Sequence, residues 1–294
     1  MFLLCMAGAA LAQQEEKTLL EPVIARQMAG RAGTVVVVDV ESGRVLARHN
    51  AKMAAQRVTA PGSAVKPLVL MELLQSGKLD PQQRVFCRRA LTIAGRRMDC
   101  SHPEAINSLD APDAIAYSCN TYFATMAARL TPLELKHVYE RAGFTAPTHF
   151  VTAEATGRVA LAPDTPELQL QALGDWGVEI TPLELLAAYR TLALAKLKGD
   201  APAAAAPVFD GLERSVKYGM AHAAQPAGIT AAGKTGTAGN SGSAQTHGFF
   251  AGYAPADKPE IALVVYLEQG RGSDAAAVAG AIFTAYASAK RAGR

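Results

Sequence analysis

The chain carries three short segments that combine hydroxyl, amine and amide side chains in patterns suited to acyl transfer. They read Ser-x-x-Lys at 63–66, Ser-x-Asn at 118–120 and Lys-Thr-Gly-Thr at 234–237. Each segment alone is also typical of plain structure: a helix cap, a helix start and a glycine-rich edge strand. All three in this order are far rarer than any one of them. The combination predicts one enzyme site assembled from distant parts of the chain.

Ser63 and Lys66 form the pair suited to nucleophilic catalysis. A serine hydroxyl is a poor nucleophile until a base removes its proton. The sequence predicts a helix that opens at Ser63, so that Lys66 lies on the same helical face three residues later. Burial lowers the pKa of a lysine and lets its neutral amine act as a base. We therefore expect Ser63 to be the nucleophile and Lys66 its base.

Ser118 and Asn120 lie two residues apart, in a turn predicted between two helices, and are expected to point the same way. A second hydroxyl can pass a proton to a leaving amine, and a side-chain amide can bind a substrate carbonyl. We expect these two roles for Ser118 and Asn120, respectively.

The segment around Lys234 is predicted to be a strand that binds a substrate carboxylate. Side chains alternate along a strand, which places Lys234 and Gly236 on one face and Thr235 and Thr237 on the other. Gly236 allows a ligand to approach the backbone closely. The lysine charge and the two hydroxyls suit a carboxylate, and a strand N–H beside Ser63 would complete an oxyanion hole.

Hydrophobic periodicity predicts an α+β domain that brings these segments together. Strand patterns occupy Thr34–Val40, Arg44–Arg48, Ile229–Ala238, His247–Tyr253 and Glu260–Glu268. Helical patterns occupy residues 13–31, Ser63–Gln75, Ala111–Tyr117, Asn120–Leu130, Thr131–Ala142, Thr181–Leu197, part of Val208–Ala223, and Ala275–Lys290. Residues 77–110, 145–180 and 201–207 are predicted to be loops or irregular. We expect an antiparallel sheet of the N- and C-terminal strands, flanked by helices, with an all-helical middle region.

Composition restricts the class of protein. The 294 residues are 50% hydrophobic with a formal net charge of +3, which supplies a full core for one large domain or for two small ones. No dense Lys/Arg block occurs and aromatic residues make up 6%, which disfavours nucleic acid as a partner. The six histidines show no His-x-x-x-His spacing, which disfavours a zinc hydrolase, and we expect neither a metal nor another cofactor.

Residues 1–12, MFLLCMAGAALA, have the features of a signal peptide. The stretch is apolar, too short to span a bilayer comfortably, and ends in the small-residue pattern Ala-Leu-Ala. The plain alternative is a frayed or buried N-terminus. On the first interpretation, residues 13–294 form a single exported domain in the periplasm or another extracytoplasmic space. An uncleaved N-terminus would instead attach that domain to the membrane.

Cys87 and Cys100 allow two interpretations. In an oxidising compartment they could close a disulfide around residues 88–99. Spacing alone does not distinguish this bridge from two separate buried thiols, and both alternatives stay open.

Taken together, these motifs resemble the transpeptidase domain of penicillin-binding proteins over nearly all of residues 33–290. The segments that carry the resemblance are PGSAVKP at 61–67, YSCNTYF at 117–123, ALG and ITPLEL at 172–174 and 180–185, GKTGTA at 233–238, and HGFFAGYAP at 247–255. Cys87 and Cys100 also resemble cysteines that many of these proteins carry.

The resemblance implies the serine acyltransferase fold and a role for each catalytic residue. It implies that Ser63 is acylated with Lys66 as its base. Ser118 would shuttle the proton, and Asn120 would hold a substrate amide.

The resemblance also implies what the site binds. Lys234, Thr235 and Thr237 would bind the substrate carboxylate, and the backbone N–H groups of Ser63 and Thr237 would form the oxyanion hole. The implied substrates are peptidoglycan stem peptides ending in D-Ala-D-Ala, and the implied inhibitors are β-lactams. Other cell-wall synthesis proteins are implied as partners.

Departures from the family pattern keep other functions open. Where the family commonly has Gly-Gln-Gly, this chain has Gly-Asp-Trp-Gly at 174–177, and a tryptophan there resembles class D β-lactamases. Those enzymes normally lack the asparagine that Asn120 supplies. We therefore predict a serine D,D-transpeptidase or D,D-carboxypeptidase. One alternative is a class D-like serine β-lactamase, and another is a non-catalytic sensor that binds β-lactams or peptidoglycan.

Overall fold

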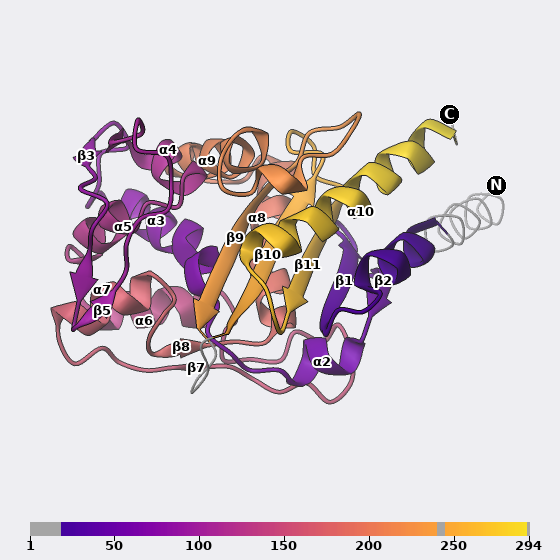
Figure 1. Ribbon diagram of the computed structural model, residues 1–294, viewed down its shortest axis with the longest axis horizontal. Coiled ribbons are helices and arrows are strands. Elements are labelled where there is room, and N and C mark those ends of the chain that lie inside the picture. Colours follow the sequence, from indigo (N-terminus) through magenta and orange to yellow (C-terminus); the bar gives the residue numbers. More distant parts are fainter. Residues whose placement is uncertain (1–18, 240–244, 293–294) are drawn as a thin grey trace.

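The computed structural model describes residues 19–239 and 245–292 (Figure 1). The predicted signal peptide, residues 1–12, lies outside the described residues. The sequence predicts an N-terminal helix over residues 13–31. In the described part, which starts at residue 19, the chain is helical up to residue 28. No helix in the two described ranges is both long enough and apolar enough to cross a bilayer.

One five-stranded antiparallel sheet unites the two ends of the chain (Figure 1). In spatial order its strands are β2 (Val45–His49), β1 (Gly33–Asp39), β11 (Ile261–Leu267), β10 (Thr246–Ala254) and β9 (Ala232–Gly239). β1 pairs with β11 along its whole length. The predicted sheet of N- and C-terminal strands is confirmed. The largest difference in strand ends is at β9, which begins at Ala232 rather than Ile229.

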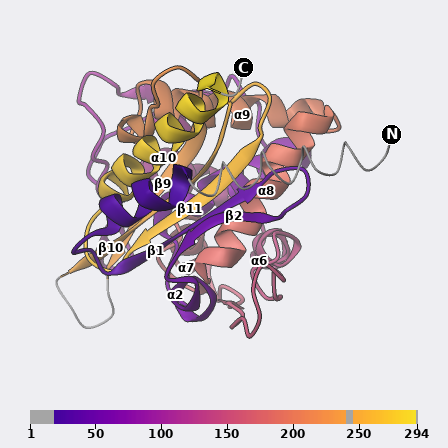
Figure 2. The same cartoon turned by 90° about the vertical axis from the view of Figure 1, so that its right-hand side faces the viewer.

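Both faces of the sheet are covered, which explains its nearly unbroken apolar strands. On β1, Val36 and Val38 belong to the larger core, which the helical region shares. Val35 and Val37 belong to a second core, which includes Phe283 of the C-terminal helix. Figure 2 shows this helix, α10 (Gly272–Ala292), beside the N-terminal helix on one side of the sheet, with α8 (Pro182–Lys198) on the other.

The helix α3 (Lys66–Gln75), most of whose apolar residues are buried, packs against α4 (Ala111–Ala116), α5 (Asn120–Ala127), α6 (Pro132–Arg141) and α9 (Ala206–Lys217) in the region between β2 and β9. The other helices of this region are α2 (Ala51–Gln56), α7 (Thr165–Ala172) and α8, with 3-10 turns η1 (Gly62–Val65), η2 (Ala203–Ala205) and η3 (His222–Ala224). α6 and α8 each begin with a threonine–glutamate capping box, as the repeated Thr-Pro-Leu-Glu predicts.

The middle region departs from the prediction because it is not all helical. It also contains three two-stranded pairs: β3 (Val85–Phe86) with β6 (Ser108–Leu109), β4 (Thr92–Ile93) with β5 (Arg96–Arg97), and β7 (Arg158–Val159) with β8 (Val178–Glu179). Strands of two residues are too short to show a sequence period, and short helices such as α2 and α7 form mainly through tertiary packing. The loop predicted at 201–207 contains η2 and the start of α9.

Candidate active site

Ser63 lies in η1, directly before α3, where it is half-buried. The predicted helix therefore begins as a 3-10 turn, and its α-helical part starts at Lys66. η1 packs against β9, and glycines permit the approach. A Cβ on Gly236 would lie 2.2 Å from the Pro61 carbonyl oxygen. Gly62, at a φ of +54°, would bring a Cβ within 2.6 Å of the carbonyl oxygen of residue 237.

Lys66 is fully buried behind this turn. Its Nζ donates hydrogen bonds to the backbone oxygen of Ser118 at 2.8 Å, to Ser118 Oγ at 3.3 Å and to Asn120 Oδ1 at 2.5 Å. Burial lowers the pKa of Lys66 to about 8, although the nearby Cys119 and Cys100 act in the opposite direction. A substantial fraction of this amine is therefore neutral near physiological pH.

Ser118 and Asn120 lie at the junction of α4 and α5, as predicted. Ser118 has a φ of +54°, a left-handed conformation that is uncommon for residues other than glycine and is found at functional sites. Asn120 Nδ2 donates to the backbone oxygen of Met98 at 2.9 Å, while its Oδ1 accepts from Lys66. The orientation of the Asn120 amide is therefore held from both of its ends.

Lys234 reaches the same hydroxyl from β9. Its Nζ donates to Ser118 Oγ at 2.9 Å and to the backbone oxygen of Thr235 at 3.0 Å. Burial, together with the neighbouring charge of Lys66, lowers the pKa of Lys234 well below its ordinary value. Within the described ranges neither lysine is paired with a carboxylate. Two buried, unpaired amines cost the fold stability, so their convergence on one hydroxyl points to chemistry.

Thr235 and Thr237 lie on the face of β9 opposite Lys234, as strand alternation predicts. Thr237 Oγ1 accepts the N–H of Gly272, the first residue of α10, at 2.9 Å. A Cβ on Gly272 would lie 2.7 Å from Thr235 Cβ, and Thr235 is only 7% exposed. Thr237 is exposed, so of the two threonines it is the one whose side chain a ligand can reach directly.

The structure brings Lys66, Ser118, Asn120 and Lys234 into one hydrogen-bonded group. Ser63 lies outside this group: among the described residues, its hydroxyl makes no hydrogen bond with Lys66 Nζ. The two residues are joined only through the backbone, where the Lys66 N–H donates to the Ser63 carbonyl oxygen. Catalytic hydrogen bonds are often long before substrate binds, so this geometry is compatible with the predicted nucleophile and base.

Three residues that support the site were not among the predicted site residues. Tyr189 Oη, the Gly174 carbonyl oxygen and His247 Nε2 contact the backbone of residues 60–64, at 2.7, 3.0 and 2.7 Å. Gly174 and His247 belong to segments that carry the family resemblance. No feature of the sequence identifies Tyr189 as a site residue, because a tyrosine in an apolar helix looks like any other buried core residue.

Cys87, Cys100 and Cys119 are all free and buried. The disulfide between Cys87 and Cys100 is therefore not formed, which leaves the alternative of buried thiols. Cys87 and Cys100 are not separate thiols either, because their sulfurs lie within 4.8 Å of each other, and Cys100 Sγ also lies 3.8 Å from Cys119 Sγ.

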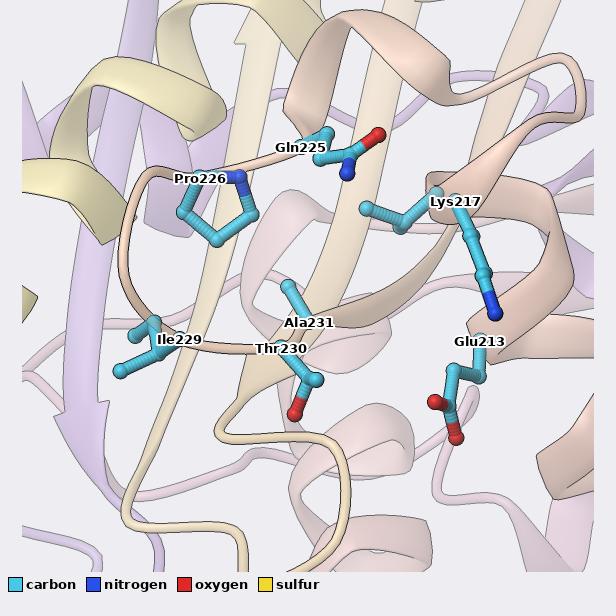
Figure 3. A pocket seen from close by; sticks show the side chains of 8 residues that line it. Glu213, Lys217, Gln225, Pro226, Ile229, Thr230 and Ala231 are labelled. Atoms are coloured by element: carbon cyan, nitrogen blue, oxygen red, sulfur yellow. The ribbon is translucent and has the colours of Figure 1, made fainter.

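A small pocket lies away from these motifs, between α9 and the segment before β9 (Figure 3). Glu213 and Lys217 of α9 line one side of it, and Pro226 and Thr230 line another. None of the motif residues lines this pocket, so it is separate from the predicted site.

The sequence model of one protein family, described as "Penicillin binding protein transpeptidase domain", matches residues 33–287 of this chain. Among curated proteins, the chain is 27% identical over 277 residues to peptidoglycan D,D-transpeptidase FtsI of Escherichia coli K12, covering 80% of this chain and 47% of that protein. It is 26% identical over 352 residues to peptidoglycan D,D-transpeptidase MrdA of Acinetobacter baumannii, covering 90% of this chain and 52% of that protein. The chain thus spans about half the length of these relatives.

Solved structures share the fold. The TP domain of penicillin-binding protein 3 from Burkholderia pseudomallei superposes with a TM-score of 0.81 at 21% identity, covering 96% of this chain and 95% of that chain. PBP2 of Pseudomonas aeruginosa, in complex with WCK 5153, gives a TM-score of 0.79 at 24% identity, covering 92% of this chain and 74% of that chain. The predicted α+β class, with an antiparallel sheet flanked by helices, is confirmed.

Proposed function

This chain belongs to the penicillin-binding protein transpeptidase domain family, and we propose that it is a serine D,D-transpeptidase or D,D-carboxypeptidase acting on peptidoglycan stem peptides that end in D-Ala-D-Ala. The observation that carries the proposal is the convergence of two buried lysine amines on Ser118 Oγ, beside the motif that begins at Ser63. The relatives that are named peptidoglycan D,D-transpeptidases support the substrate class.

In the proposed reaction, Ser63 Oγ attacks the carbonyl carbon between the two D-Ala residues while neutral Lys66 takes its proton. The backbone N–H groups of Ser63 and Thr237 stabilise the oxyanion of the tetrahedral intermediate. Its collapse breaks the C–N bond, and a proton passes through Ser118 to the leaving D-Ala amine. Water or the amine of a second stem peptide then attacks the ester and regenerates Ser63.

The remaining residues hold the substrate. Lys234 and Thr237 bind the terminal carboxylate, with Thr235 behind them, and Gly236 lets the peptide lie close to β9. Asn120 Nδ2 binds a substrate amide oxygen by giving up its weaker contact, the one of 3.5 Å with the backbone oxygen of Asp99. β-Lactams would acylate Ser63 in the same way. Export through the predicted signal peptide would bring the domain to its substrate and to other cell-wall synthesis proteins.

Intact-protein mass spectrometry with a penicillin over time tests this proposal. We expect one adduct, located on Ser63 after digestion, because Ser63 is the acylated hydroxyl. Ser63→Ala should not be labelled, whereas Ser76→Ala, an exposed serine at the end of α3, should be labelled like the wild type. An adduct retained on folded Ser63→Ala would overturn the assignment.

The fate of the adduct separates the candidate functions. A transpeptidase or carboxypeptidase should keep the adduct, hydrolyse nitrocefin negligibly and release D-Ala from a peptide ending in D-Ala-D-Ala. Rapid nitrocefin turnover stimulated by bicarbonate would instead indicate a class D-like β-lactamase. A stable adduct without any D-Ala release would indicate a binding module.

A further inference from the structure

A surface ion pair joins two segments that reach the site from different directions. Arg96 of β5 donates from Nη1 to Asp175 Oδ2 at 3.0 Å and to the Asp175 carbonyl oxygen at 3.5 Å. The Arg96 side chain is 50% exposed and that of Asp175 is 26% exposed. We propose that Arg96 and Asp175 are positioning residues for the acyl transfer described above, the function on which this inference rests. Their pairing holds the Asn120 side of the site at a fixed distance from Ser63.

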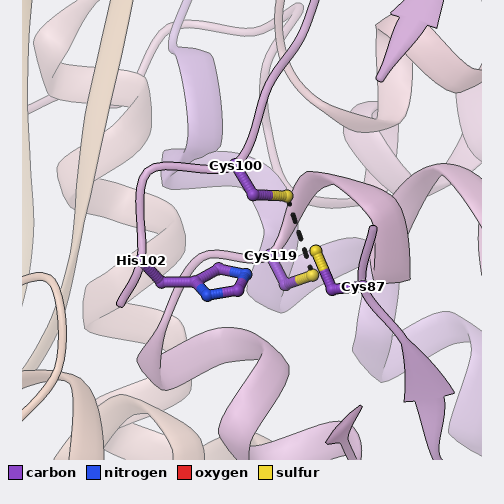
Figure 4. A group of neighbouring side chains, drawn as sticks. All are labelled: Cys87, Cys100, His102 and Cys119. Atoms are coloured by element: carbon purple, nitrogen blue, oxygen red, sulfur yellow. Dashed lines mark hydrogen bonds between the residues drawn. The ribbon is translucent and has the colours of Figure 1, made fainter. Parts of the chain in front are cut away.

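The hairpin of β4 and β5 connects Arg96 to Asn120. Its turn, residues 94 and 95, has a positive φ at both positions, +47° and +75°, as a tight two-residue hairpin turn requires. Met98, two residues after Arg96, accepts the Asn120 amide on its carbonyl oxygen at 2.9 Å. Figure 4 shows the continuation of this segment at Cys100, whose sulfur lies 3.8 Å from that of the cysteine in the Ser-x-Asn turn. A displacement of Arg96 would therefore reach the Asn120 amide over only two residues of chain.

The loop after α7 connects Asp175 to the nucleophile turn. Gly174, directly before Asp175, accepts the Gly62 N–H on its carbonyl oxygen at 3.0 Å. The two backbones are in close contact, because a Cβ on Gly174 would lie 2.1 Å from the Gly62 carbonyl oxygen. Gly62 in turn lies directly before Ser63 and against the backbone of residue 237 in β9. Asp175 is therefore one residue away from a contact that places the nucleophile turn.

These contacts form a closed ring around the site. The ring runs from η1 through the loop after α7 and the ion pair to the hairpin and Asn120. It returns to η1 through Lys66, whose Nζ donates to Asn120 Oδ1 at 2.5 Å. The other noncovalent links in the ring are hydrogen bonds to a backbone carbonyl oxygen or from the buried amine of Lys66, whereas the ion pair is partly exposed. Exposed ion pairs contribute little to stability and are screened by salt, so this link can loosen while the fold stays intact.

The spacing that the ion pair sets matters for acylation. In the proposed reaction the substrate lies between Asn120 and β9, with its carbonyl carbon at Ser63. A misplacement of about 1 Å can cost about 100-fold in rate, and a partial loosening costs less, so loss of the pair should lower the limiting rate constant of acylation by about 10-fold. The affinity for penicillin before acylation should change less, because neither side chain of the pair contacts the ligand in this proposal.

A double-mutant cycle on the full chain tests the proposal through acylation rates measured over a range of penicillin concentrations. Arg96→Gln and Asp175→Asn should each slow acylation about 10-fold, and the double variant should be no slower than either, because the two side chains form one link. Glu179→Gln is the matched control: it breaks another exposed pair, with Arg158 at 2.6 Å, and should leave the rate unchanged. All these variants should unfold at nearly the wild-type temperature, because exposed pairs contribute little to stability.

Salt gives a second readout that a merely structural role would not change. Raising the ionic strength from about 0.01 M to about 1 M shortens the Debye length from about 30 Å to about 3 Å. The higher salt should slow acylation of the wild type and of Glu179→Gln more than that of Arg96→Gln or Asp175→Asn, since those two have already lost the pair.

Hydrogen exchange of the free protein separates this inference from the proposed function, because it requires no acylation. The Gly62 N–H, which donates to Gly174, and the Met98 N–H, which donates to the backbone oxygen of residue 91, should exchange faster in Arg96→Gln and Asp175→Asn than in the wild type or the control. If these differences appear but the wild type is not acylated, the positioning link stands and only the proposed function fails.

Three results would overturn the positioning role while the wild type is acylated. The first is a wild-type acylation rate in both single variants, and the second is losses that add fully in the double variant. The third is slower acylation without faster exchange, because the charges would then act on the ligand rather than on the backbone of the site.

Discussion

Lys66 sets the pH dependence expected of acylation. Only its neutral form can accept the Ser63 proton, and burial lowers its pKa to about 8. Besides burial, the groups that act on this amine are Cys119 and Cys100, which raise its pKa. The second-order rate constant for penicillin acylation should rise about tenfold per pH unit below that pKa and level off above it. Labelling rates measured on both sides of that value check this, and a flat profile would show that the base is another group.

The two lysines should differ in what their loss removes. Lys66→Ala should be nearly as damaging to acylation as Ser63→Ala, because nucleophile and base act as a unit. Lys234→Ala should mainly weaken capture of the substrate carboxylate, by about 10- to 100-fold, as for the loss of a hydrogen bond to a charged group. The rates of acylation by a penicillin and by its methyl ester, measured for Lys234→Ala and for the wild type, test this role. An equal loss for acid and ester would contradict the role of Lys234.

At the scale of elements, the site depends on the contact between η1 and β9. The Cβ of Gly236→Ala would lie 2.2 Å from a backbone oxygen, which cannot move aside as a flexible side chain could. The strand and the nucleophile turn should separate, and a misplacement of about 1 Å can cost about 100-fold in rate. Gly239→Ala on the same strand is the matched control, because no residue in the described ranges comes within 4 Å of its added Cβ. Penicillin labelling and thermal melting of both variants check this, and equal labelling rates would exclude the tight contact.

At the scale of the whole molecule, two cores on opposite faces of the sheet hold the fold together. Phe283 of α10 is fully buried in the second core, where its ring contacts Phe250 edge-on with centroids 6.2 Å apart. Phe283→Ala should lower the free energy of unfolding by about 3–5 kcal/mol. Leu133→Ala, at a position 54% exposed on α6, should change it by less than about 0.5 kcal/mol. Urea denaturation of the two variants measures both values, and similar midpoints would mean that α10 does not stabilise the sheet.

The parts of the fold that could be predicted are those encoded by neighbouring residues. At Thr131 and at Thr181 the threonine hydroxyl accepts the backbone N–H of the glutamate three residues later, and that glutamate's carboxylate accepts the threonine N–H, so two helix starts are visible in the sequence. The valine run of β1 and the strand of Lys234 show their extended character in the same local way. Four of the eight predicted site residues, Lys66, Ser118, Asn120 and Lys234, do meet in the structure.

What the sequence alone determined was therefore the class of fold, the identity of the chemical groups and the order in which they occur. Only the tertiary structure decided that two amines share Ser118 Oγ, that Thr235 is buried against α10, and that Cys100 lies against Cys119 rather than joining Cys87. The physical reason is that these contacts join residues 19 to 116 positions apart. Local propensity carries no information about such distances, because the packing of α3, α5 and β9 around a common core sets them.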